Sequence, residues 1–456
     1  MSIKLKTEAY DNRRFFKLLF TLAFPIILQN LLHSSLTLLD ILMIGQLNEA
    51  SIAAVGIANQ FAFIFLVIQF GVQSGISIFT AQHWGKKDYK SIKNLVGIGL
   101  ILGLLISLLF TYVAIFIPEI LLSLFTKDIV VINLGTNYLR IIGISFSITV
   151  VTLTYTFNLR STEIVKMPLY ASAIAVFLNI FLNYILIFGK FGFPALGVTG
   201  AAIATSISRV VEGLFLVSAV YIKKYPAAAT FKEMIGFDLS YIKNILGTCW
   251  PVLLNEIFWV TGVSLYNLVY ARIGTGSIAA VNIVASVENF AMIPFFGVFS
   301  AGSIIVGNLI GAGYEKEAYR ISKRLLIVQF VMATVTGGLM IASRGTILSF
   351  YNISDIAFKN AYNLMLVVGV VLWVKATNYT LIVSIFRGGG DTRFGLLLDV
   401  FGVWLIGVPM AFTGAFYFSL PVYYVMTMVV TEEIVKLSFA VPRFFSKKWI
   451  RNVVKE

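Results

Sequence analysis

Residues 38–61 read LLDILMIGQLNEASIAAVGIANQF, and Asp40 is the acid that stands within the apolar part of this run. Residues 268–290 read LVYARIGTGSIAAVNIVASVENF, a related phrase from which that acid is missing. Positions 25–90 align with 251–316 without a gap, and 18 of the aligned positions are identical. The identities form blocks, which shared composition alone would not produce, so the chain is predicted to contain two related halves.

The composition is that of a membrane protein. Of the 456 residues, 59% are hydrophobic and only 12% are charged, and the mean hydropathy is +0.90. A soluble protein carries about 25% charged residues. Apolar stretches of at least about 20 residues recur along the chain, and each can cross a hydrocarbon core of ~30 Å as an α-helix. The first stretch is too long for a signal peptide and lacks a small-residue cleavage site, so we expect it to be retained.

Polar residues divide the chain into twelve apolar segments. The predicted fold is therefore an all-α polytopic membrane protein with twelve transmembrane helices in two pseudo-symmetric six-helix lobes. The segments are 15–45, 51–84, 94–118, 131–158, 168–189, 197–222, 243–271, 277–311, 321–343, 357–386, 394–416 and 420–441. The expected domains are an N-terminal tail 1–14, an N-lobe 15–222, a linker 223–242, a C-lobe 243–441 and a C-terminal tail 442–456.

The distribution of basic residues predicts the orientation. If both termini are inside, 26 of the 35 Lys and Arg residues lie in inward-facing segments. This bias predicts an even number of spans, cytoplasmic termini and a multi-pass protein of the plasma (inner) membrane. A net charge of +14 can indicate nucleic-acid binding, but here the basic residues lie in short loops beside apolar spans. Attraction to an anionic inner leaflet is the better interpretation, and we expect no nucleic-acid partner.

Enzyme chemistry has little support in the sequence. The chain has one cysteine, Cys249, and two histidines, His33 and His83, so it offers no Cys/His metal cluster. It also lacks a nucleophile elbow and a phosphate-binding loop. The stretch at 387–391 ends without the Gly-Lys-Ser/Thr of such a loop, and we expect Asp391 to cap the next helix instead. We therefore expect a protein that is not an enzyme and has no organic cofactor.

Six motifs in order resemble those of the multidrug and toxic-compound extrusion (MATE) family, and the resemblance covers essentially the whole chain. They are Pro25 with Asp40 fifteen residues later, Gly45 with the Ala-Ala-Val-Gly at 53–56, Asn179-Ile-Phe-Leu-Asn183, the stretch 197–205, Gly307-Asn-Leu-Ile-Gly-Ala-Gly313 and Arg387-Gly-Gly-Gly-Asp-Thr392. The resemblance implies a twelve-helix antiporter that expels drugs, often cationic and amphipathic, in exchange for H⁺ or Na⁺. It also implies small-molecule drugs and membrane lipids as partners, and we expect a monomer.

The resemblance further implies an ion-coupling site. In the family, an acid on span 1, an asparagine on span 5 with an acid four residues later, and a threonine on span 6 form it. The matching residues here are Asp40, Asn179, Asn183 and Thr205. Asn183 departs from the pattern because it replaces the second acid, which leaves H⁺ and Na⁺ open as coupling ions. The same four residues are the only candidate Na⁺ ligands, and no other metal site is expected.

The residues themselves also single out Asp40. It lies 23 residues beyond Lys17, which is about 35 Å along a helix at ~1.5 Å per residue, and this places it at membrane depth. Gln29, His33, Leu36 and Asp40 share one helical face, which we expect to look into the protein. Intramembrane acids are usually functional, although a satisfied structural carboxylate is the alternative. For Asn179 and Asn183 the alternative is interhelical hydrogen bonding, and for Arg209 with Glu212 we expect a structural ion pair.

The second half contains further charges within its spans, namely Glu256, Glu288, Lys375 and Asp399. Some members of the family place cation-binding acids on spans 7 and 10, but Glu256 is not at the usual spacing and span 10 has Lys375 instead. A Glu256–Lys375 ion pair would neutralise both charges, and we expect it. The weaker candidates for a substrate cavity are Gln29, His33, Glu256, Lys375 and Tyr379.

Other functions remain as alternatives. A lipid-linked oligosaccharide or lipid flippase of related architecture would favour an anionic substrate and a cavity rich in Arg or Lys. This interpretation stays open because the spans contain three basic residues, Arg140, Arg209 and Lys375. The twelve predicted spans and the match of Asp40 to the acid of the MATE family count against it. A channel would need a ring of pore-lining residues rather than two facing halves.

Overall fold

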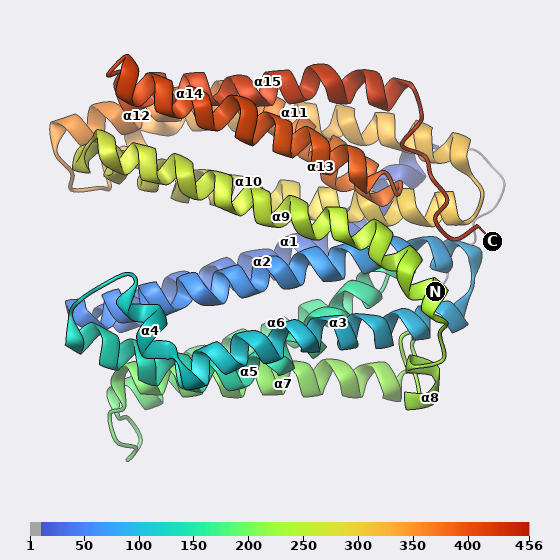
Figure 1. Cartoon of the computed structure of the whole chain (residues 1–456), viewed down its shortest axis with the longest axis horizontal. Coiled ribbons are helices and arrows are strands. Elements are labelled where there is room, and N and C mark those ends of the chain that lie inside the picture. The colour runs from blue at the N-terminus through green and yellow to red at the C-terminus, as the bar shows by residue number, and fades with distance from the viewer. Residues whose placement is uncertain (1–10, 456) are drawn as a thin grey trace. The chain divides into compact units, whose positions relative to one another are not determined.

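The computed structural model describes residues 11–455, and residues 1–10 and 456 of the two expected tails lie outside the described residues. The described part is helical and contains no β-strand, so the all-α prediction is confirmed (Figure 1). The helices of the first half are α1 (Asn12–Gly45), α2 (Glu49–Lys86), α3 (Tyr89–Phe116), α4 (Pro118–Ser123), α5 (Ile129–Ser161), α6 (Lys166–Phe188) and α7 (Gly197–Ile222).

The second half repeats this order after a short linker helix, α8 (Phe231–Met234). Its helices are α9 (Leu239–Ile273), α10 (Thr275–Gly311), α11 (Glu315–Leu348), α12 (Asp355–Tyr379) with the π-helical η1 (Thr380–Phe386), α13 (Thr392–Val400), η2 (Phe401–Gly407), α14 (Val408–Phe412), η3 (Thr413–Tyr417) and α15 (Val422–Phe445). The three π-helical segments continue the helices that they adjoin.

Eleven helical segments of the described chain are long and apolar enough to cross a membrane, and each lies within a few residues of a predicted span. The exception among the predicted spans is the last, α15, which has 24 residues but contains Glu432, Glu433 and Lys436. All three of these side chains are buried within the protein. The multi-pass helical fold is therefore confirmed, and its last helix is unusually charged.

Local polar residues define where several helices begin and end. Asp88 accepts a hydrogen bond from the Ser91 backbone N–H at the start of α3, and Asp128 accepts from Val130 N–H at the start of α5. Ser354 does the same at α12 through Ala357 N–H. At the end of α6, Gly189 has a φ of 67°, a left-handed conformation that favours glycine. These caps satisfy backbone groups that a helix end leaves free.

The chain divides into two compact units. Unit 1 contains Met1–Ile27, Gly85–Lys87 and Phe258–Glu456, and unit 2 contains Leu28–Trp84 and Asp88–Ile257. Both α1 and α9 change unit shortly after an internal proline, Pro25 or Pro251. The units and the lobes expected from the sequence thus differ in residues 15–27, 85–87 and 243–257.

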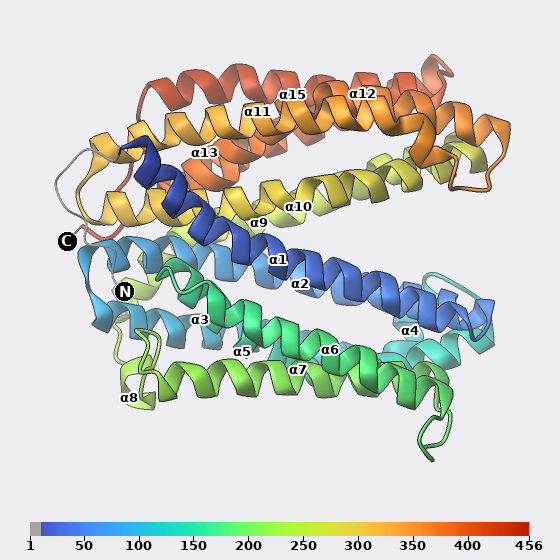
Figure 2. The same ribbon diagram turned by 180° about the vertical axis from the view of Figure 1, so that it is seen from behind.

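The first part of α1 packs within unit 1, and Figure 2 shows it crossing the helices of this unit. A side chain at Gly297 of α10 would collide with Ala23 and Ile27, so glycine permits this close crossing. Also in unit 1, α12 contacts α10, α11 and α15, and α15 contacts η2. In unit 2, α5 contacts α3 and α7, and α6 packs along α7.

Asp391 corrects one detail of the sequence analysis. It occupies the N-cap position of α13, but its side chain makes no capping hydrogen bond. Its buried carboxylate instead binds Arg443 (Nη2 to Oδ2, 2.7 Å) and Arg451 (Nη2 to Oδ1, 3.0 Å). Two guanidinium groups outcompete the weaker backbone donors of a helix end. Asp391 therefore fastens the C-terminal segment, whose Trp449 is fully buried against Phe444.

The linker helix α8 is held against α3 by Glu233. Its Oε1 lies 2.8 Å from Lys93 Nζ, and its Oε2 accepts hydrogen bonds from the backbone N–H and side chain of Thr230. The hydrogen bond from Lys93, followed by those from Thr230, lowers the pKa of Glu233 to about 2. Because the folded-state pKa is lowered, this stabilisation is present above the ordinary value of 4.5 and is lost as the pH falls toward 2.

We expect Glu233→Gln to loosen α8 at neutral pH. Hydrogen exchange of the amides in α8, corrected for the intrinsic rate, should increase several-fold, and wild type should reach this state only as the pH falls from 4.5 toward 2. Glu119→Gln removes the partner of Arg140 at another exposed ion pair and is the matched control. Equal exchange of α8 in wild type and Glu233→Gln at neutral pH would contradict the assignment.

Candidate functional site

The structure places Asp40 of α1 beside α6, in the interior-facing stripe that the sequence predicts. Its side chain is partly buried, and Oδ1 accepts a hydrogen bond of 2.6 Å from Asn183 Nδ2. Asn183 itself is almost fully buried. A carboxylate at this depth needs such a donor, because an unpaired buried charge is costly.

The hydrogen bonds continue from Asn183 to two more of the predicted residues. Asn183 Nδ2 also donates to Asn179 Oδ1 over 2.8 Å, one turn earlier on α6. Asn179 Nδ2 in turn donates to Thr205 Oγ1 of α7 over 3.3 Å. Asp40, Asn183, Asn179 and Thr205 thus form one connected chain across three helices, all within unit 2.

The hydrogen bonds that join these four residues have a defined direction from donor to acceptor. Both N–H groups of the Asn183 amide are used, one on Asp40 and one on Asn179. The buried Asn183 Oδ1 has no hydrogen-bond partner among the described residues. Asp40 is therefore met by a donor, which suits an ionised carboxylate that has released its proton.

A second polar network lies further along the same face of α1. Gln29 Nε2 donates to Ser172 Oγ over 2.7 Å, and Ser172 donates to Glu212 Oε1 over 2.7 Å. Arg160 Nη2 donates to Gln29 Oε1 over 2.5 Å. The predicted pair of Arg209 and Glu212 is confirmed, with Nη1 and Oε2 3.2 Å apart.

His33 lies between these two networks in the sequence of α1 and is partly buried. It interacts electrostatically with Glu212, Arg209 and Arg160. Together with the hydrogen bonds of Gln29 and Asp40, this confirms that the predicted stripe looks into the interior of unit 2. The polar face of α1 thus runs from Asp40 to the network that contains Arg160, Arg209 and Glu212.

Unit 1 corrects the partner expected for Lys375. Its Nζ lies 2.5 Å from Oε1 of Glu288 on α10, so the predicted ion pair of Lys375 with Glu256 is wrong. Glu256 lies on the part of α9 that belongs to unit 2. Tyr379, one turn after Lys375, stacks on Phe299 with ring centroids 5.7 Å apart. The partner of Lys375 lies on another helix, α10, and residue spacing along a single span cannot predict a contact between two helices.

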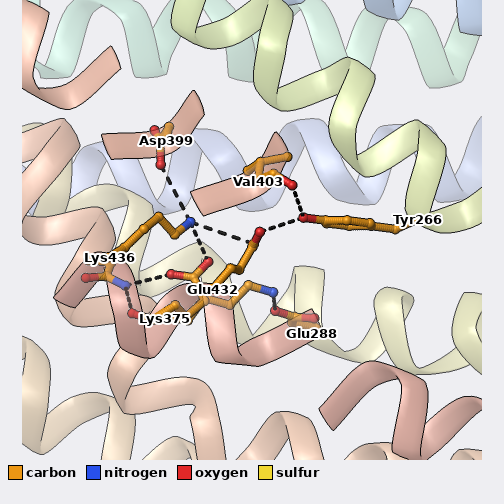
Figure 3. Close-up of polar contacts among 9 residues, drawn as sticks. Tyr266, Glu288, Lys375, Asp399, Val403, Glu432 and Lys436 are labelled. Atoms are coloured by element: carbon orange, nitrogen blue, oxygen red, sulfur yellow. Dashed lines mark hydrogen bonds and ion pairs between the residues drawn. The ribbon is translucent and has the colours of Figure 1, made fainter. Parts of the chain in front are cut away.

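A charged cluster around Lys436 of α15 was not predicted from the sequence (Figure 3). The Lys436 ammonium lies 2.9 Å from Glu433 Oε1, 3.6 Å from Asp399 Oδ1 and 3.8 Å from Glu432 Oε1. Tyr266 of α9 donates a hydrogen bond of 2.5 Å to Glu432 Oε2. The available signal was the presence of three charged residues close together in an apolar span.

The MatE family model matches this chain twice, over residues 25–185 and 251–413. The two matches start at Pro25 and Pro251, the pair of positions with which the aligned stretches of the internal repeat also begin. Together they cover more than half of the chain.

Curated relatives match over most of their length. A probable multidrug resistance protein NorM from Thermotoga maritima is 24% identical over 442 residues, covering 96% of this chain and 94% of that protein. A probable multidrug resistance protein YoeA from Bacillus subtilis is 28% identical over 419 residues, covering 87% and 86%.

Solved structures share the fold at low sequence identity. A crystal structure of MATE in complex with MaL6 has a TM-score of 0.86 at 20% identity and covers 95% of this chain and 97% of that chain. A transporter of the MOP superfamily from Pyrococcus furiosus, described as having a binding pocket of reverse polarity, also has a TM-score of 0.86 at 20% identity, covering 95% and 96%.

Proposed function

Since this chain belongs to the MatE family of multidrug efflux transporters, which are not enzymes, we propose that it is a secondary antiporter that exports amphipathic, often cationic drugs in exchange for H⁺. The observation that carries the proposal is the hydrogen-bonded chain of Asp40, Asn183, Asn179 and Thr205. It surrounds one intramembrane carboxylate with neutral polar groups, so that Asp40 is the group that gains and loses charge.

The direction of the hydrogen bonds supports H⁺ over Na⁺ as the coupling ion. A Na⁺ ion would need oxygen ligands that face Asp40, whereas Asn183 presents an N–H group to the carboxylate. Binding of Na⁺ would require this amide to turn over and to give up its bond to Asn179. A proton needs only Asp40. Protonation from outside would favour drug release, and deprotonation toward the inside would prepare the site for a cationic drug.

The remaining parts of the proposal follow from topology. We propose alternating access between the two related halves, as internal repeats permit in secondary transporters. The excess of Lys and Arg in the loops on one side supports cytoplasmic termini in a plasma membrane. A monomer is sufficient, because the proposed coupling residues all belong to one chain.

The structure weakens the support for a flippase of anionic lipids. The three cationic residues that kept this alternative open are each paired with a carboxylate of the same unit. Arg140 binds Glu119, Arg209 binds Glu212, and Lys375 binds Glu288. Paired in this way, they provide little free positive charge for an anionic headgroup.

Drug uptake into inside-out vesicles, driven separately by a pH gradient and by a Na⁺ gradient, tests the proposal. A cationic fluorescent drug should accumulate with the pH gradient alone and be released by a protonophore. Transport that needs Na⁺ and ignores the protonophore would contradict H⁺ coupling. Absence of drug transport with either gradient, from protein shown to be folded, would contradict the antiporter function itself.

Asn183→Asp should move the pH profile of transport upward. The change places a second carboxylate 2.6 Å from Asp40, where repulsion between two negative charges favours retention of one shared proton. We expect the profile of drug exchange to shift toward alkaline pH by about one unit or more. Asn94→Asp, which changes an asparagine of α3 that is bonded to the Gly236 carbonyl of the linker, is the control. An unshifted profile in Asn183→Asp would show that Asn183 does not act on Asp40.

A further inference from the structure

The internal repeat assigns a partner position to Asp40 in the second half. In the gap-free alignment of 25–90 with 251–316, Asp40 corresponds to Tyr266. The Tyr266 hydroxyl donates to Glu432 Oε2 over 2.5 Å. An acid is therefore present in the second half as well, but α15 supplies it in place of the helix that corresponds to α1. Figure 3 shows Tyr266 pointing at this carboxylate.

The surroundings of Glu432 carry an excess of negative charge. Glu432 and Glu433 contribute two negative charges beside the single positive charge of Lys436, and Asp399 lies 3.6 Å from the same ammonium. Their side chains are only 8–13% exposed, and that of Lys436 is 5% exposed. The neighbouring Lys375 is already balanced by Glu288. Because uncompensated charge in a protein interior is costly, the cluster must take up positive charge.

Two further observations show that the packing is shaped around these side chains. Asn378 of α12 is 2% exposed, and its Nδ2 donates to Glu433 Oε2 over 2.7 Å. Oδ1 of the same amide is buried without a hydrogen-bond partner among the described residues. Glycines also make room for the cluster. A Cβ at Gly407 would collide with the Tyr266 hydroxyl and Glu432, and one at Gly402 would lie 2.7 Å from Lys436 Cδ.

The ligand that fits is a proton. Among residues 11–455 no group of three or more His, Cys, Asp or Glu side chains is arranged to hold a metal ion. Lys436 already occupies the position between the carboxylates that a cation would need. A proton requires no space beyond a carboxylate lone pair. We propose that this cluster is a second proton-binding site, in which Glu432 carries the proton and Tyr266 changes its hydrogen-bond partner when the proton binds.

Glu432 is the best carrier among the three carboxylates. It lies farthest from the Lys436 ammonium, 3.8 Å against 2.9 Å for Glu433, so the lysine stabilises its charge least. Glu433 also accepts a hydrogen bond from Asn378, which favours its ionised form. Asp399 lies 3.6 Å from the same ammonium.

The geometry of Tyr266 provides two hydrogen-bond states. When Glu432 is ionised, the Tyr266 O–H donates to Glu432 Oε2 over 2.5 Å. When Oε2 binds a proton, the new O–H donates to the Tyr266 oxygen, and the phenol hydrogen rotates to the backbone carbonyl of Val403, 3.4 Å away. No covalent bond other than O–H is made or broken, and the charge of the cluster becomes more positive by one. Val403 lies in the π-helical η2, a type of segment frequent at functional sites.

Titratable and charged groups face this site from each element packed around it. They are Tyr266 and Tyr270 on α9, Glu288 on α10, Lys375 and Tyr379 on α12, Asp399 on α13, and Glu433 and Lys436 on α15. Among them, Lys375 is paired with Glu288, and the Lys436 ammonium lies within 4 Å of Glu433, Asp399 and Glu432. A proton on Glu432 therefore relieves repulsion without breaking either ion pair.

Proton binding here does not depend on the proposed antiport, but its use in transport does. If the chain exchanges drug for H⁺ at Asp40, a second site would add a proton to each cycle. The two sites are separated experimentally in an Asp40→Asn background, where the proton of the first site is absent.

The test measures proton uptake by purified protein in detergent when the pH is lowered from about 8 to about 5. Within the Asp40→Asn background, Glu432→Gln should take up about one proton fewer per molecule. Glu119→Gln, which removes an exposed carboxylate, is the matched control and should leave this uptake unchanged. The infrared band of a protonated carboxyl group should appear on acidification and be missing in Glu432→Gln.

Tyr266→Phe provides the second variant and needs no change of charge. It should shift the infrared band of the protonated carboxyl group, because the hydrogen-bond partner of Glu432 is lost. Tyr362→Phe, near the start of α12 with its ring stacked on Phe358, should leave the band in place. Equal proton uptake with and without Glu432, or a band that Tyr266→Phe leaves unmoved, would overturn the proposal whatever the outcome of the transport assays.

Discussion

Asp40→Asn should reduce gradient-driven drug transport to the background of empty vesicles while the protein still inserts and folds. The amide has the shape of the carboxylate, and its oxygen can still accept the hydrogen bond from Asn183. The substitution removes a charge from the membrane interior, so it should not destabilise the fold. It also removes the one group of the chain Asp40–Asn183–Asn179–Thr205 that can bind and release a proton.

The measurement compares drug uptake under a pH gradient at equal amounts of wild type and variant in vesicles. Asp128→Asn is the matched control, because Asp128 caps α5 outside the membrane and asparagine caps helices equally well. This control should transport at the wild-type rate. Wild-type uptake by Asp40→Asn would remove Asp40 from the coupling mechanism.

Lys436→Met should lower the free energy of unfolding by about 3–5 kcal/mol, the range for removing one partner of a buried ion pair. Methionine preserves most of the volume and flexibility of the lysine stem. The loss leaves Glu433, Asp399 and Glu432 around a position without positive charge. Chemical denaturation in detergent, followed by tryptophan fluorescence, measures the effect.

A compensating change distinguishes this electrostatic origin from a packing defect. Adding Glu433→Gln to Lys436→Met removes the carboxylate that lies 2.9 Å from the ammonium, and it should restore part of the stability. Lys448→Met, an exposed lysine beyond α15, should change stability by at most about 0.5 kcal/mol. Equal stability of Lys436→Met and wild type would show that the cluster is not charged in the folded protein.

Much of the fold could be predicted because membrane insertion leaves a local signature. Apolar runs of sufficient length fix the helices, and the internal repeat predicted the two matches of the family model. The hydrogen-bonded residues around Asp40 could be predicted from the sequence because Asn179 and Asn183 lie one helical turn apart on α6 and match family motifs. In each case the information lies within a short stretch of sequence.

The contacts that were missed join distant helices. Lys375 binds Glu288 from a helix that is 87 residues away in the sequence, and Tyr266 and Glu432 are separated by 166 residues. Asp391 binds arginines of the C-terminal segment, where helix-end statistics favour a cap. The placement of residues 15–27 in unit 1 likewise depends on the packing of Ala23 and Ile27 against Gly297. The placement of residues 243–257 in unit 2 depends on the packing of Cys249 against Gly75 and of Leu253 against Gly71. Periodicity within one helix contains no information about these partners.

The most direct test of H⁺ coupling at Asp40 records the proton movement that a drug gradient causes. Vesicles that contain a pH-sensitive dye and the purified protein receive a cationic drug on one side, in a buffer free of Na⁺. We expect drug entry to drive proton exit with wild type and with Asp128→Asn, and no drug-dependent pH change with Asp40→Asn. Drug movement without any pH change in wild type, or the same pH change with Asp40→Asn, would contradict the account.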